Sequence, residues 1–86
     1  MADNTSLPSR SQRWVTTMNG HRLRHLRHHA GLSQADLGGR AGISLTTIVR
    51  LEHSPHASCR PRTLARLAAA LGEAPATLSS VEHSGD

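Results

Sequence analysis

The 86-residue sequence predicts a single all-α domain built from four or five short helices. The apolar residues, 36% of the chain, are almost all Leu, Ala, Ile and Val, and there is one Trp but no Phe or Tyr. Ala, Leu and Arg favour helices. Runs of β-branched residues are few, and no segment alternates apolar and polar residues as a half-buried strand does. These observations argue against a sheet and suit a small bundle that buries about 60% of its unfolded surface.

The first helix is expected to begin at Gly20 and to stop at Gly31. Apolar side chains at helical spacing form its inward face, at Leu23, Leu26 and Ala30. Basic side chains cover the other face, at Arg22, Arg24, His25, His28 and His29. The segment therefore predicts an amphipathic helix with a cationic outer surface.

Ser33 and Ser44 are good N-caps for the next two helices. The second helix is expected to end before Gly42, and Asp36 supplies the acidic residue that a first turn favours. The third helix is expected over residues 45–53, and its inward residues are Ile48 and Leu51.

Pro55 cannot continue the third helix, so residues 54–60 are expected to form a loop. Pro61 opens a fourth helix, and Gly72 stands where a left-handed C-terminal residue belongs. A short fifth helix over residues 75–78 closes the bundle. The apolar stripe of the fourth helix consists of Leu64, Leu67, Ala68 and Leu71.

Composition sets the expected domain boundaries. Residues 1–18 mix Ser, Thr, Asn, Pro and Arg without periodicity and are expected to form a flexible N-terminal arm. Two states are open for Trp14, packed on the domain or mobile with the arm. Residues 19–79 are expected to form the folded domain, and residues 80–86 a disordered C-terminal tail.

Positive charge is concentrated in the part of the chain that is expected to fold. All ten basic residues are Arg. Between Gly20 and Gly72 there are eight Arg and only two acids, Asp36 and Glu52, a net charge of +6, whereas two Arg and four acids leave the flanks at −2. Guanidinium groups bind phosphate through paired hydrogen bonds, and phosphate contacts release counterions, so this charge suits a polyanion. An ordinary solvated surface is the alternative.

Residues 34–53 have the spacing of two helices joined by a tight turn. Gly38 is small enough to let the second helix approach the third, and Gly42 can adopt the positive φ that the turn requires. Apolar residues occupy the positions that must face inward, namely Leu37, Ala41, Ile43, Ile48 and Leu51.

In these residues the chain resembles the phage repressor and Cro-like family of helix-turn-helix DNA-binding domains, also called the xenobiotic-response-element type. The resemblance spans residues 23–78 and rests on the segments LRHLR (23–27), AGLSQ (30–34), AGIS (41–44), TIVRLE (47–52) and TLARLAAALG (63–72). It implies a lambda-repressor-like fold whose third helix lies in the major groove. The family often has Gly soon after the position of Glu52, whereas this chain has His-Ser-Pro and a longer loop. This difference affects where Arg60 and Arg62 lie relative to the DNA backbone.

The resemblance also implies roles for individual residues. Base contacts fall to the third helix, at Leu45, Thr46, Val49 and Arg50. Phosphate contacts fall to Ser33, Gln34, Arg40, Thr47, Arg60 and Arg62. Arg27 and Glu52 match a partly buried ion pair with a structural role.

The sequence therefore predicts a bacterial, sequence-preferring regulator of transcription that binds double-stranded DNA. We expect a homodimer with half-sites about one helical turn apart. The alternative is a protein-interaction module, an antitoxin or anti-regulator, that uses the same fold to bind a partner protein. Because the sequence lacks a nucleophile motif, a phosphate-cradling Gly loop and a carboxylate pair, we expect neither an enzyme nor a cofactor.

The histidines and the single cysteine do not form a recognised zinc pattern. His25 and His29 are four residues apart on a helix, and His53, His56 and Cys59 cluster in the loop, but no metal site is expected. Protonation of the histidines at low pH is expected to tighten DNA binding. With one Cys and no apolar stretch of membrane-spanning length, the protein is expected in the cytoplasm, associated with the nucleoid and not with a membrane.

Overall fold

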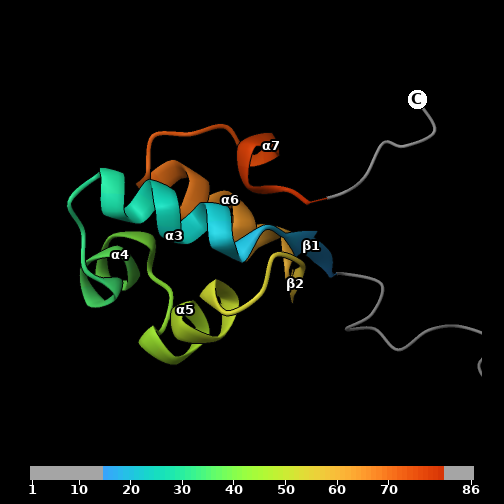
Figure 1. Cartoon of the computed structure of the whole chain (residues 1–86), viewed down its shortest axis with the longest axis horizontal. Coiled ribbons are helices and arrows are strands. Elements are labelled where there is room, and N and C mark those ends of the chain that lie inside the picture. The colour runs from blue at the N-terminus through green and yellow to red at the C-terminus, as the bar shows by residue number, and fades with distance from the viewer. Residues whose placement is uncertain (1–14, 81–86) are drawn as a thin grey trace, which may run out of the picture.

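The computed structural model describes residues 15–80, in which five helices surround one apolar core (Figure 1). Trp14 and most of the expected arm and tail lie outside the described residues. The helices are α3 (Gly20–His29), α4 (Gln34–Ala41), α5 (Leu45–Glu52), α6 (Pro61–Ala70) and α7 (Pro75–Leu78). All five predicted helices are thereby confirmed. Over the described stretch, none of these helices has the length and apolar character needed to cross a membrane.

Local hydrogen bonds explain where α4 and α5 begin. The Ser33 hydroxyl accepts the Asp36 N–H at 2.9 Å while the Asp36 carboxylate accepts the Ser33 N–H at 3.1 Å, which forms a capping box. The Ser44 hydroxyl accepts the Thr47 N–H at 3.2 Å. Between the two helices Gly42 has φ +71°, the left-handed conformation that the turn was expected to need. These contacts fix the direction in which α5 leaves the turn.

The capping box predicts a pH-dependent contribution to stability. The hydrogen bond from the Ser33 backbone lowers the pKa of Asp36 from its ordinary value of 3.8. A lowered pKa in the folded state means that the carboxylate stabilises the protein above the unfolded-state pKa and that this stability is lost as pH falls through the folded-state pKa. Asp36→Ala should therefore melt below the wild type near pH 7, and the difference in thermal melts should shrink as pH falls below the ordinary pKa value of 3.8. A difference independent of pH would contradict this role.

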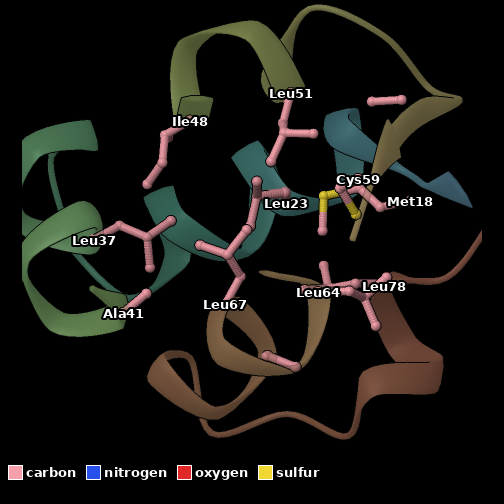
Figure 2. Close-up of a cluster of buried hydrophobic side chains, with 12 residues drawn as sticks. Met18, Leu23, Leu37, Ala41, Ile48, Leu51, Cys59, Leu64, Leu67 and Leu78 are labelled. Carbon is pink, nitrogen blue, oxygen red and sulfur yellow. The ribbon is translucent and has the colours of Figure 1, made fainter. Parts of the chain in front are cut away.

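The core lies where α3, α4, α5 and α6 meet (Figure 2). In Figure 1, α3 crosses the middle of the molecule, with α4 and α5 below it and α6 and α7 above it. The helices contribute the residues that their apolar spacing placed inward, with one exception: Ala30 is exposed, because it is the C-cap residue that follows α3. The fully buried side chains are Met18, Leu23, Leu37, Ile48, Leu51, Leu67 and Leu78.

A small antiparallel sheet, which the sequence analysis argued against, closes one end of the bundle. It pairs β1 (Thr16–Met18) with β2 (Ala57–Cys59), and Thr16 lies opposite Cys59. Two further backbone hydrogen bonds hold β1 from the other side, from Asn19 N–H to the Leu78 carbonyl at 2.7 Å and from Ser80 N–H to the Thr17 carbonyl at 3.0 Å.

The sheet corrects three expectations. The last three residues of the arm expected over 1–18 form β1, and the loop expected over 54–60 contains β2. The folded domain expected over 19–79 therefore extends at least from residue 16 to residue 80, where the tail was expected to begin. The physical reason is the burial of Met18, which has no exposed surface and adds to the core a side chain that lies outside any helix.

Candidate nucleic-acid interface

One side of α5 packs on the core and the other faces solvent. Ile48 and Leu51 have no exposed surface. Leu45 is 50% exposed. Thr46 and Arg50 are also exposed, and Val49 is half-buried. The structure thus places all four residues expected to contact bases on the solvent side of α5.

A buried ion pair anchors the end of α5 to α3. Arg27 Nε lies 2.6 Å from Glu52 Oε2, Arg27 Nη2 donates to Glu52 Oε1 at 2.9 Å, and both residues are only 6% exposed. These hydrogen bonds raise the pKa of Arg27 above its ordinary value. Arg27 Nη1 also donates to the Leu32 carbonyl at 2.9 Å, and Gln34 Nε2 donates to Glu52 Oε1 at 3.0 Å. One carboxylate therefore joins α3, α4 and α5, and its charge is neutralised inside the protein.

Two hollows flank the exposed side of α5. The first, about 370 Å³, lies toward α3 and α4 and brings Val49 together with Gln34. Arg24, His28 and His53 also line it, with the Arg27–Glu52 pair beneath. Gln34 is thus held by Glu52 beside the residues of α5 that face solvent.

The second hollow, also about 370 Å³, lies toward β2 and α6. It brings Thr47 and Arg50 together with Arg60. Arg50 Nη1 donates to the Ser58 carbonyl of β2 at 3.2 Å, which leaves most donors of this guanidinium available for a ligand. Cys59 also lines this hollow, and burial raises the pKa of its thiol, which favours the unreactive protonated form.

The remaining residues expected to contact phosphate lie outside these hollows. Ser33 is engaged in the capping box of α4. Arg40 lines a separate hollow on the outer face of α4, with Asp36 and Gly39. Arg62 is exposed in the first turn of α6. The structure brings Gln34, Thr47 and Arg60 to the flanks of α5 and leaves Ser33, Arg40 and Arg62 outside them.

A family model described as a helix-turn-helix domain matches residues 20–81 of the chain. The chain belongs to this family. Two solved structures are similar to it. The restriction-modification controller protein C.AhdI from Aeromonas hydrophila is 31% identical, with a TM-score of 0.62 over 67% of this chain and 86% of that chain. The complex of SinR protein with SinI protein matches at 23% identity, with a TM-score of 0.68 over 80% of this chain and 67% of that chain. No curated protein matches the sequence.

These findings confirm the resemblance to Cro/C1-type, or xenobiotic-response-element type, helix-turn-helix regulators. The fold is lambda-repressor-like, mostly helical, with the small two-stranded sheet as an addition. The family consists of DNA-binding transcription regulators and is non-enzymatic. The chain is therefore a member of a family of helix-turn-helix regulators that bind DNA.

Three of the side chains that line the first hollow were not predicted to belong to the helix-turn-helix surface, namely Arg24, His28 and His53. His53 follows Thr46 by seven residues and caps the end of α5 in a helical conformation, so the helical period places it on the same side as Thr46, and this signal could have identified it. Arg24 and His28 share a face of α3 at i, i+4, but only the packing of α3 against α5 shows that this face borders the first hollow. Residues 15–80 bring no three potential metal ligands together, and the rings of His25 and His29 meet edge to face with centroids 5.6 Å apart.

Proposed function

We propose that the protein is a sequence-preferring transcriptional regulator that inserts α5 into the major groove of double-stranded DNA. Leu45, Thr46, Val49 and Arg50 contact base edges in this proposal. The phosphate contacts come from Ser33, Gln34, Arg40, Thr47, Arg60 and Arg62. Arg27 and Glu52 support the interface from within and do not touch DNA.

The observation that carries the proposal is the exposed side of α5 between two hollows lined by basic and polar groups. A major groove is wide enough to admit a helix, and its base edges offer hydrogen-bond acceptors and thymine methyl groups. Arg50 can donate two hydrogen bonds to guanine, and Leu45 and Thr46 can contact thymine methyl groups. Gln34 and Arg60 lie on opposite flanks of α5, where the two phosphate backbones border the groove.

The proposal predicts different effects for two arginine variants. Arg50→Ala should cost about 1–3 kcal/mol on the preferred sequence and relax the preference at one base pair. Arg62→Ala should weaken binding to all sequences alike and reduce the salt slope by about one. Duplexes selected from a random-sequence library supply the preferred site, and fluorescence anisotropy over a salt series measures both effects.

Arg22→Ala is the matched control, since Arg22 is exposed on α3 and lines neither hollow beside α5. It should leave both the sequence preference and the affinity nearly unchanged. Equal losses on every sequence for Arg50→Ala and Arg62→Ala would remove Arg50 from the base contacts.

Binding of a partner protein is the second candidate function. The observation in its favour is that two large apolar side chains, Leu45 and Val15, are 50% and 43% exposed, and a protein surface could cover each of them. The similar SinR protein was solved in complex with SinI protein. The selection experiment separates the two candidates, because a partner-binding module would enrich no duplex sequence. A homodimer would enrich two half-sites about one helical turn apart.

A further inference from the structure

A band of basic side chains runs along one side of α3. It consists of His21, Arg24, His25 and His28, all of them exposed, and we call it the α3 band. These four residues line a shallow hollow of about 450 Å³. The sequence of α3 contains no acid, so within the helix nothing offsets this charge.

The α3 band is continuous with the exposed side of α5. Arg24 and His28 line both the hollow on α3 and the first hollow beside α5. In the first hollow they meet Val49 of α5 and His53, the residue that follows α5. A ligand that covers α5 on this side therefore reaches the α3 band without crossing any other element.

The acid beside the α3 band is already neutralised. Glu52 is the only acid that lines either of the two hollows, and it is held by Arg27 at 2.6 Å and by Gln34 at 3.0 Å. The helix that packs on α3 from the opposite side, α7, has the sequence PATL and no titratable side chain. The α3 band thus presents positive charge to solvent with no carboxylate of these elements free to pair with it.

We infer that the α3 band binds the sugar–phosphate backbone of the duplex that α5 contacts. The DNA interface would then extend beyond α5. This inference rests on the proposed function. Arg24 supplies a bidentate phosphate donor, and each imidazole supplies a further N–H donor. The continuity with α5 favours the polyanion already bound there over an acidic protein segment, which would have no reason to adjoin the recognition helix.

The histidine content of the α3 band couples this contact to pH. Histidine is the side chain that ordinarily changes its charge between about pH 5 and 8. The charged and titratable groups beside His28 are Arg24 on its own helix, the Arg27–Glu52 pair beneath and His53 just after α5. His28 Nε2 lies 3.4 Å from Arg27 Nη2. A phosphate brought against His28 stabilises its imidazolium, so binding takes up a proton and tightens as pH falls.

The two sides of α3 provide matched variants for the test. Arg24→Ala with His28→Ala removes an arginine and a histidine from the α3 band, and Arg22→Ala with His29→Ala removes the same residue types from outside it. All four residues are exposed, so both double variants should melt close to the wild type. The probe is a mixed-sequence duplex of about two helical turns, with anisotropy measured over a salt series.

We expect Arg24→Ala/His28→Ala to weaken binding by about tenfold at low salt and to reduce the salt slope by about one, with Arg22→Ala/His29→Ala unchanged. At fixed salt, wild type and His29→Gln should bind more tightly at about pH 6 than at about pH 8, and His28→Gln should lose part of that gain.

The inference would be overturned if the two double variants lost the same amount of duplex affinity, or if neither lost any. If Arg62→Ala still lowers the salt slope in that case, the proposed function stands and only the α3 band is excluded. If the substitutions in the α3 band left duplex binding unchanged, the band would instead fit an acidic protein partner, and this result would also overturn the inference. A wild type that binds no duplex at all would overturn the proposed function and the inference with it.

Discussion

Replacing Glu52 by Ala should lower the free energy of unfolding by about 3–5 kcal/mol, because it leaves the guanidinium of Arg27 buried without its counter-charge. Both side chains of the pair are only 6% exposed, so solvent cannot replace the lost carboxylate. Gln34 loses a hydrogen-bond acceptor in the same variant. In a domain of this size each kcal/mol lowers Tm by about 4–8 °C, and thermal melts should show the loss directly.

A second variant separates the buried charge from the lost packing. Arg27→Met combined with Glu52→Leu removes both charges and keeps apolar volume, and such replacements of buried pairs are often close to neutral. The double variant should therefore melt above Glu52→Ala, although the Leu32 carbonyl loses the hydrogen bond from Arg27 Nη1. If Glu52→Ala lost less than about 1 kcal/mol, the pair would not tie the three helices together in the way the geometry indicates.

The helices were predictable because the signals that set them are local. Ser33 and Ser44 cap α4 and α5 through hydrogen bonds that span only three residues, and Pro61 opens α6 where its fixed φ is tolerated. Apolar residues at helical spacing then fixed which side of each helix faces the core. The same periodicity predicted which side of α5 is exposed, and the four residues that the family resemblance implies as base contacts lie on that exposed side.

The strands and the contacts around the site depend on residues far apart in the chain. Each strand has only three residues, too few for alternation to stand out, and β1 is held by β2 about forty residues later. The hydrogen bonds from Gln34 to Glu52 and from Arg50 to Ser58 arise from packing between elements, and no local sequence pattern predicts them. The Arg27–Glu52 pair was expected from the family resemblance alone.

Replacing each of three glycines by Ala should change the free energy of unfolding by amounts that differ in size and sign. At Gly20 a Cβ would overlap the Leu51 backbone carbonyl, where the start of α3 crosses the end of α5. The backbone cannot readily shift away, since the Gly20 N–H donates to the Ser54 carbonyl at 2.9 Å and Leu51 is fully buried. Gly20→Ala should therefore cost more than the roughly 1–3 kcal/mol typical of overpacking and should prevent stable folding.

The neighbouring glycines Gly38 and Gly39 of α4 complete the series. At Gly38 a Cβ would stand 2.6 Å from the Ile43 carbonyl, so Gly38→Ala should lose about 1–3 kcal/mol by pushing α4 away from the turn before α5. At Gly39 a Cβ meets nothing within 4 Å, so Gly39→Ala should gain about 0.5–1 kcal/mol from helix propensity. Urea unfolding measures all three, and a gain at Gly38 or Gly20 would mean that α3, α4 and α5 approach less closely than they do here. Because the spacing of these helices positions the exposed side of α5, Gly38→Ala should also weaken duplex binding, whereas Gly39→Ala should leave it unchanged.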